Sequence, residues 1–135
     1  MKTISRRIVS GVAVLAVALP LSSAQAAHAA AAGPGEWDDL GSHDVFYRSM
    51  YRTDAVKSAG GDFKACITTT TTENEAYHLR EGDGDPQHTQ RVATVYGAGC
   101  WIFRDIGSYV DGDNNRAEFF IGTTDGSMLR VHYWD

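Results

Sequence analysis

Short extended segments separated by turn-forming residues are the feature of this sequence that most constrains its fold. The segment Phe63–Thr72 is rich in β-branched residues, which favour strands. Similar segments follow between clusters of Gly, Asn and Asp, and no long, well-capped helix interrupts them. We therefore predict an all-β fold, a small antiparallel β-sandwich. The further strands expected are 75–80, 91–96, 100–104, 116–121 and 128–134.

The segment 43–57 allows two interpretations. Phe46 and Met50 lie four residues apart, as on one face of a helix, and Ser42 is a residue type that caps helices. The same segment also alternates in the manner of a strand, and its Tyr and Thr residues favour strands. We expect a strand because β signals dominate the rest of the chain. The alternative is an α+β fold with one short N-terminal helix near 43–57.

The last two strands are predicted to form a hairpin around Asp125-Gly126, a strong two-residue turn signal. This register pairs Phe120 with Val131 on one face and Phe119 with His132 on the other. Both faces are then substantially apolar, whereas a sheet with one solvated face carries polar groups there. The hairpin is therefore either covered on both sides or exposes a binding patch. The residues assigned to that patch are Phe119, Ile121, Tyr133 and Trp134.

The N-terminal residues have the pattern of a secretory signal peptide. Lys2, Arg6 and Arg7 form a basic region, and the uncharged apolar run Gly11–Leu19 follows it. This run is shorter than the roughly 20 residues that a helix needs to span a bilayer. Small residues then offer Ala-x-Ala cleavage sites, which place cleavage between Ala26 and Ala29.

We accordingly divide the chain into a signal peptide (1–29), a flexible leader (30–36) and a single β-rich domain (37–135). Cleavage removes 3 of the 12 basic side chains and none of the 17 acidic ones, so the formal net charge changes from −5 to −8. Such a surface repels polyanions, which argues against nucleic acid and anionic membranes as partners. We expect a secreted protein, free of the membrane after signal removal, whose partner is an extracellular protein or carbohydrate.

The two cysteines, Cys66 and Cys100, are predicted to form a disulfide, because a pair of cysteines in an exported chain is usually oxidised. Closing this loop would stabilise the fold by about 3–4 kcal/mol in the chain-entropy model. A catalytic cysteine is disfavoured, since the sequence contains no Cys-x-x-Cys motif.

Two acidic loops are candidates for calcium binding. In one of them Asp111, Asp113 and Asn115 alternate, as oxygen ligands do in calcium loops, but Arg116 and Gly122 stand where an EF-hand requires Gly and Glu. In the other, three carboxylates within five residues repel one another unless solvent or a cation separates them. The residues of this second loop are Glu81, Asp83 and Asp85. The alternative is an ordinary polar turn in both places. Calcium is the only cofactor that the sequence suggests.

No catalytic residue is assigned. Ser42-His43-Asp44 contains the residue types of a hydrolytic triad, but a triad takes its geometry from distant segments and not from neighbours. Glu118 and His132 are the types of a general acid–base pair, yet the predicted hairpin puts them on opposite faces.

Three functions remain open on these grounds. We expect a small secreted non-enzymatic binding domain acting on an extracellular protein or carbohydrate, an inhibitor being one form of it. One alternative is a calcium-stabilised extracellular structural domain. The other is a small secreted hydrolase using a His/carboxylate pair, which requires His132 or His78 within about 3–4 Å of a carboxylate.

Overall fold

The computed structural model describes residues 37–82 and 88–135. The expected signal peptide (1–29) and leader (30–36) lie outside these residues. In the described part of the chain no helix is long and apolar enough to cross a membrane. Its elements are β1 (Asp39–Asp44), β2 (Phe46–Tyr47), β3 (Tyr51–Arg52), β4 (Val56–Ser58), β5 (Phe63–Thr69), β6 (Ala76–Glu81), β7 (Gln90–Tyr96), β8 (Gly99–Phe103), a 3-10 turn (Ile106–Tyr109), β9 (Ala117–Thr123) and β10 (Met128–Trp134).

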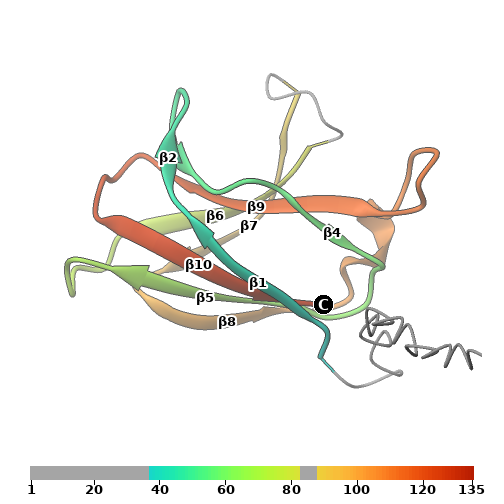
Figure 1. The fold of residues 1–135 in the computed structure, drawn as a ribbon, viewed down its shortest axis with the longest axis horizontal. Helices are drawn as coiled ribbons and strands as arrows, with labels where there is room; N and C mark the ends of the chain where they lie inside the picture. The colour runs from blue at the N-terminus through green and yellow to red at the C-terminus, as the bar shows by residue number, and fades with distance from the viewer. Residues whose placement is uncertain (1–36, 83–87) are drawn as a thin grey trace, which may run out of the picture. The chain divides into compact units, whose positions relative to one another are not determined.

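The strands form two antiparallel sheets that pack face to face (Figure 1). Sheet A has the order β1-β10-β5-β8, and sheet B has the order β2-β3-β9-β6-β7, with β4 also pairing with β9. The predicted all-β sandwich is therefore confirmed. The alternative helix near 43–57 is wrong, because this segment breaks into short strands that pair with one another and with β9. Ser49, at the turn between β2 and β3, has a φ of 59°, which a right-handed helix cannot accommodate.

The hydrophobic core lies between the two sheets and is built from alternate residues of each strand. On β5 the side chains of Phe63, Ala65 and Ile67 are buried, whereas those between them are partly exposed. The ring of Phe63 lies 5.7 Å from that of Tyr133 in its own sheet and 5.0 Å from that of Phe119 in sheet B. Such aromatic contacts join the two sheets at the centre of the domain.

Cys66 and Cys100 form the predicted disulfide, with an S–S distance of 1.96 Å. They are direct partners across the β5–β8 ladder. The disulfide therefore joins an inner strand of sheet A to the strand at its edge.

The predicted hairpin of the last two strands is wrong. β9 lies in sheet B and β10 in sheet A, so the connection through Asp125 carries the chain from one sheet to the other. A two-residue hairpin turn of the expected type needs positive φ at both central residues, and neither Asp125 nor Gly126 has one. Asp125 instead stabilises a wider turn, accepting a hydrogen bond from the Ser127 N–H at 2.7 Å.

The predicted surface patch is wrong for the same reason. Phe119, Ile121 and Tyr133 are fully buried, and Trp134 is half-buried. β9 is an inner strand of sheet B, so its alternate residues face the core on one side. On its other side Phe120 is covered by the guanidinium of Arg52, 3.5 Å from the ring centroid. The sequence left two explanations for the apolar faces of the last strands, cover on both sides or an exposed patch. For β9 the first is correct, because both of its faces are covered.

The hydroxyl of Tyr133 links the two sheets through the core. It accepts a hydrogen bond from the backbone N–H of Ile121 at 2.9 Å and lies 2.6 Å from Thr53 Oγ1. Because Thr53 donates its own proton to the carbonyl of Asp54, Tyr133 is the donor toward Thr53. Burial raises the pKa of Tyr133 far above its ordinary value, which keeps the hydroxyl neutral and available as a donor.

We predict that Tyr133→Phe destabilises the fold by about 1–3 kcal/mol, because it leaves the Ile121 N–H buried without its acceptor. Urea unfolding monitored by tryptophan fluorescence measures the change. The matched control is Tyr96→Phe, which removes a hydroxyl from an exposed ring on β7. Equal effects of the two substitutions would contradict the assigned role.

Candidate functional site

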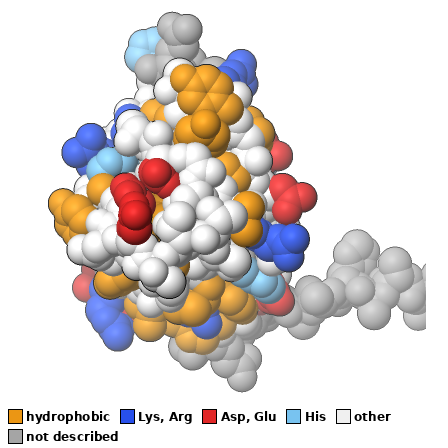
Figure 2. All heavy atoms as spheres, turned by 90° about the vertical axis from the view of Figure 1, so that its left-hand side faces the viewer, with side chains coloured by type: hydrophobic (Ala, Val, Ile, Leu, Met, Phe, Trp, Pro, Cys, Tyr) orange, Lys and Arg blue, Asp and Glu red, His pale blue; other side chains and the backbone are white. Residues whose placement is uncertain are grey.

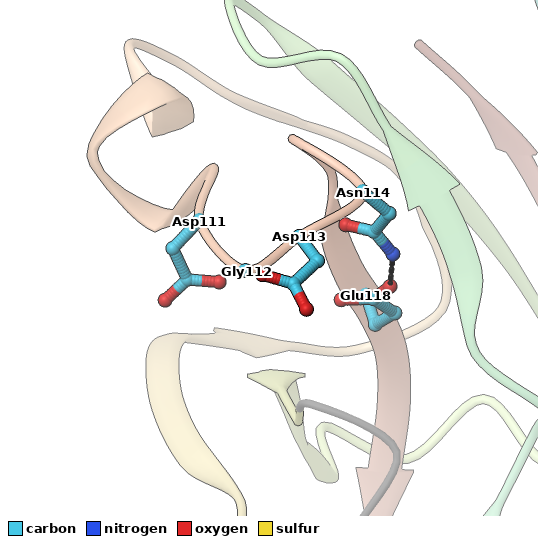
Figure 3. Close-up of a pocket in the computed structure, with 5 residues that line it drawn as sticks. All are labelled: Asp111, Gly112, Asp113, Asn114 and Glu118. Atoms are coloured by element: carbon cyan, nitrogen blue, oxygen red, sulfur yellow. Dashed lines mark hydrogen bonds between the residues drawn. The ribbon is translucent and has the colours of Figure 1, made fainter.

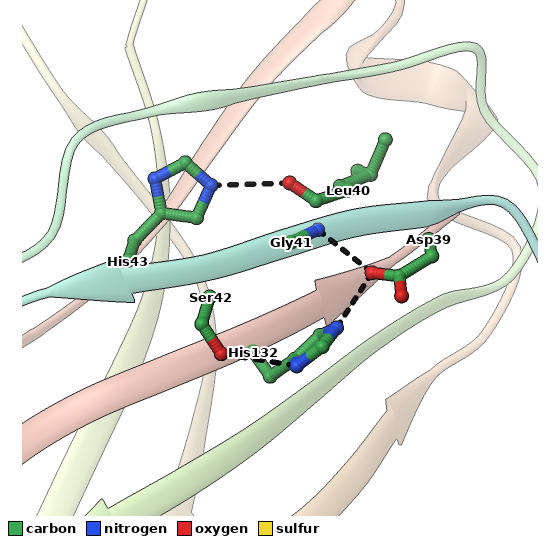
Figure 4. Close-up of polar contacts among 6 residues, drawn as sticks. All are labelled: Asp39, Leu40, Gly41, Ser42, His43 and His132. Carbon is green, nitrogen blue, oxygen red and sulfur yellow. Dashed lines mark hydrogen bonds and ion pairs between the residues drawn. The ribbon is translucent and has the colours of Figure 1, made fainter.

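A relay of three polar side chains lies on the outer face of sheet A, where β1 pairs with β10. His132 Nε2 is 2.5 Å from Asp39 Oδ1, and His132 Nδ1 is 3.0 Å from Ser42 Oγ (Figure 4). When the ring is neutral, its Nε2–H is donated to the carboxylate, and Nδ1 accepts the serine proton. We call Asp39, His132 and Ser42 the polar relay.

A β-bulge is what brings the polar relay together. Asp39 and Ser42 lie three positions apart and would face opposite sides of a regular strand. The register shifts between Asp39 and Gly41, so that one extra residue is accommodated and Asp39 turns to the face of Ser42. Gly41 has a φ of 87°, and its N–H donates to Asp39 Oδ1 at 2.8 Å. The carboxylate is therefore held by both the backbone and the imidazole.

These contacts change the acidity of Asp39. The hydrogen bond from His132, followed by that from the Gly41 N–H, lowers the pKa of the Asp39 carboxyl below its ordinary value. The polar relay contains the residue types of a hydrolytic triad. Its histidine is His132, and not His43 of the neighbours Ser42-His43-Asp44 considered from the sequence. The ring of His43 faces away from Ser42, with Nε2 3.2 Å from the carbonyl oxygen of Leu40 (Figure 4).

Trp134, the one member of the predicted patch that is not fully buried, has its ring in contact with two other side chains. The ring of His132 stacks on it at a centroid distance of 4.0 Å and an angle of 10°. Lys64 Nζ lies 4.0 Å from the indole centroid and 5.1 Å from that of Trp37. Because the imidazole covers one face of the indole, the ammonium group lies over the other. Trp134 therefore has no free ring face on which a sugar could stack.

The first predicted calcium loop forms an exposed turn beside a shallow hollow (Figure 3). Asn114 donates to Glu118 Oε1 at 2.6 Å and accepts from the Arg116 N–H at 2.9 Å, so its amide shapes the turn. Asn115, a predicted ligand, does not line the hollow. The residues that line it are Asp111, Gly112, Asp113, Asn114 and Glu118.

The described start of the second predicted loop lies beside β9, since the Gly82 N–H donates to the carbonyl of Glu118, whose side chain lines the hollow, at 3.1 Å. Glu81 is buried at the end of β6, and Asp83 and Asp85 lie outside the described residues. Within residues 37–82 and 88–135, no three His, Cys, Asp or Glu side chains are arranged to hold a metal ion. Calcium binding stays a prediction.

Two exposed aromatic side chains lie on β2, in the hairpin that β2 and β3 form. This hairpin projects from the rest of the domain (Figure 1). Phe46 is 38% exposed and Tyr47 is 67% exposed. Tyr47 packs edge-on against Tyr51 at 5.1 Å, and the Arg48 N–H donates to the Met50 carbonyl at 2.8 Å. We call residues 46–51 the aromatic tip. The residue pattern of 43–57 predicts a strand here but does not indicate that these aromatic side chains are exposed.

Comparison with known proteins identifies the family. Residues 39–133 match the family model described as the YndA coiled coil domain. The chain is 41% identical over 123 residues to "Uncharacterized protein YndA" of Bacillus subtilis (strain 168), and the match covers 90% of this chain and 89% of that protein. The chain belongs to the YndA family. No solved structure matches it.

The structure of this YndA-family chain differs from the family's descriptive name. The described residues within the matched range 39–133 form β-strands and a single 3-10 turn, with no α-helix. A coiled coil requires long α-helices with a heptad repeat of apolar residues. The described part of this chain is therefore a β-sandwich and not a coiled coil.

We predict that His132→Gln raises the pKa of Asp39 toward its ordinary value, because it removes the main hydrogen bond to the carboxylate. The check is a carbon NMR titration of the Asp39 carboxyl group. Since the folded pKa is the lower one, this bond stabilises the wild-type fold above the unfolded pKa. That contribution is lost as the pH falls through the folded value. An unchanged Asp39 titration in the variant would contradict the contact.

Proposed function

We propose that this chain is a small secreted, non-enzymatic domain that binds an extracellular protein or carbohydrate through its aromatic tip. The observation that carries the proposal is the exposure of two aromatic side chains on one short hairpin: Tyr47, which packs against Tyr51, and Phe46, which lies on the opposite face of β2. Exposed aromatic side chains are typical of binding surfaces, because they bury a large apolar area at little cost in side-chain entropy. The signal-like N-terminus and the disulfide support secretion.

The aromatic tip is held in place before any partner binds. Tyr51 pairs with Thr123 and Arg52 with Gly122, so β3 continues sheet B. A β-carbon added to Gly122 would lie only 2.7 Å from the sulfur of Met50, which shows how closely the tip packs on β9. A surface ordered in advance loses less entropy on association than a flexible loop does.

We predict that Tyr47→Ala weakens partner binding at least tenfold without changing stability, since the ring is two-thirds exposed. The measurement is retention of the secreted protein on immobilised extracellular proteins and polysaccharides, with the melting temperature recorded in parallel. Leu129→Ala, an exposed apolar side chain on β10, is the control and should leave retention unchanged. Equal retention of the Tyr47 variant and wild type would rule out the tip as the binding surface.

A second candidate function, a small secreted hydrolase, is supported by the polar relay. The His132–Asp39 pair meets the distance requirement set out from the sequence, and the Ser42 hydroxyl adds a nucleophile that the imidazole can activate. In contrast to the buried carboxylate of a serine protease triad, the Asp39 side chain is 62% exposed. The binding function therefore remains the first proposal.

If the polar relay is catalytic, a fluorophosphonate probe should label Ser42 covalently, and Ser42→Ala and His132→Gln should both abolish labelling. Intact-mass spectrometry of the protein after incubation with the probe gives the result. Ser108→Ala, in the exposed 3-10 turn, is the matched control. Labelling that persists in Ser42→Ala, or none in the wild type, would eliminate this candidate.

A further inference from the structure

Three arginines from three different strands lie on the outer face of sheet B. Arg52 on β3 is opposite Gly122 of β9, and Arg80 on β6 is opposite both Phe120 of β9 and Arg91 of β7. We call Arg52, Arg80 and Arg91 the arginine face. Its members are 28 and 11 positions apart in the sequence, so only the pairing of the strands brings them together.

The side chains of the arginine face point away from the core. Leu79, the neighbour of Arg80 on β6, and its partner Ile121 on β9 are buried in the core, so Arg80 points to the other side of the sheet. The guanidinium of Arg52 lies flat over the ring of Phe120, which is only 1% exposed and forms the floor beneath it. Arg80 is fixed by two hydrogen bonds to Thr89, at 3.0 Å to the hydroxyl and 3.2 Å to the carbonyl.

No ion pair among the described residues involves the arginine face, since these pairs involve Arg104, Arg130 and His132. The charge of Asp54 acts on Arg52 and raises its pKa, but burial and the charge of Arg48 outweigh this effect. Burial and then the charge of Arg91 lower the pKa of Arg80, and burial and then the charge of Arg48 act in the same direction on Arg52. The charged groups therefore repel one another, and a bound anion would relieve this repulsion.

This charge is unusual for an acidic chain, whose formal net charge is −5. Carboxylates also occur at the end of the sandwich that carries the β9–β10 connection, where Figure 2 shows acidic side chains near the middle and both acidic and basic ones toward the margins. At this end the charge of Asp125 raises the pKa of Glu75.

We propose that the arginine face binds an acidic polysaccharide whose carboxylate or phosphate groups repeat along its chain. This proposal rests on the binding function proposed above and names the ligand class for the surface beside the aromatic tip. Guanidinium groups bind carboxylate and phosphate in a bidentate manner. The ring of Phe46, which lies opposite Arg52 in the β2–β3 pair and is 38% exposed, offers apolar surface to a sugar ring.

The arrangement of the arginine face across several strands favours an extended ligand of low charge density. Neighbouring strands lie about 4.8 Å apart, so the backbones of Arg52 and Arg91, three strand intervals apart, are separated by roughly 14 Å across the sheet. The guanidinium of Arg52 reaches over Phe120 on β9, one strand nearer to Arg80 and Arg91. Duplex nucleic acid carries a charge about every 1.7 Å of its axis, a density that an acidic protein repels strongly. A polysaccharide with one charge per sugar unit has a lower charge density.

Titration calorimetry of the secreted protein with polygalacturonate, dextran phosphate, neutral dextran and duplex DNA tests the proposal. We expect binding of one or both charged polysaccharides, weakening as salt is added, and no binding of neutral dextran. The charged polysaccharide that binds more tightly shows whether the arginine face prefers carboxylate or phosphate groups. Tighter binding of DNA than of either polysaccharide, or no binding of either, would overturn the proposal.

Arg91→Gln is the informative variant, because this side chain is exposed and its loss should not disturb folding. We expect roughly tenfold weaker binding, as for the loss of one charge-assisted contact. Arg130→Gln is the matched control: it makes the same charge change on the outer face of sheet A and should alter binding less than twofold. Equal weakening by both variants would indicate a general charge effect and refute the site.

Two further measurements distinguish a failure of this inference from a failure of the proposed function. NMR signals of the His78 ring, beside Arg80 and Arg91, should shift when polysaccharide is added, and those of His132 should not. If Tyr47→Ala abolishes retention on an extracellular partner while Arg91→Gln binds that partner normally, the arginine face is refuted and the tip stands. If neither variant affects retention, both are refuted.

Discussion

The hydrogen bonds of the buried Tyr133 hydroxyl fix how the two sheets lie on each other. Hydrophobic packing between sheets is strong but non-directional, so by itself it selects no single alignment. The contacts from Tyr133 on β10 to the Ile121 N–H and to Thr53 act at one point on β9 and the segment beside it. β9 then carries β3 on one edge and β6 on the other. The positions of the aromatic tip and the arginine face therefore follow from this alignment.

Local patterns predict the strands from β5 onward well, but they do not predict β1 or the choice of partner strand. On β5, the alternation of Phe63, Ala65 and Ile67 is visible in the sequence and matches the observed burial. Asp125-Gly126 also gave a sound local prediction, a turn, yet the two strands around it joined different sheets. Whether two strands that follow each other in the sequence also pair depends on what covers their faces. The sequence did indicate this for β9, because a strand that is apolar on both faces must be covered on both.

The candidate sites were less accessible to sequence reasoning because each depends on tertiary structure. The polar relay needs a bulge at Gly41 to bring Asp39 to the face of Ser42, and strand parity alone predicts the opposite. The arginine face needs β3, β6 and β7 to be placed around β9, and no short motif encodes that order. The disulfide was predictable because it depends on only two residues, and the signal-like N-terminus predicts an oxidising compartment.

The pairing of β9 along both edges has a mechanical consequence. Residues 51–58 run beside one edge through β3 and β4, and β6 runs beside the other. Hydrogen bonds in an antiparallel ladder lie perpendicular to the strands, so a pull along the strand direction strains many of them at once, in shear. The geometry of this ladder should therefore resist a pull along its strands better than a pull across them.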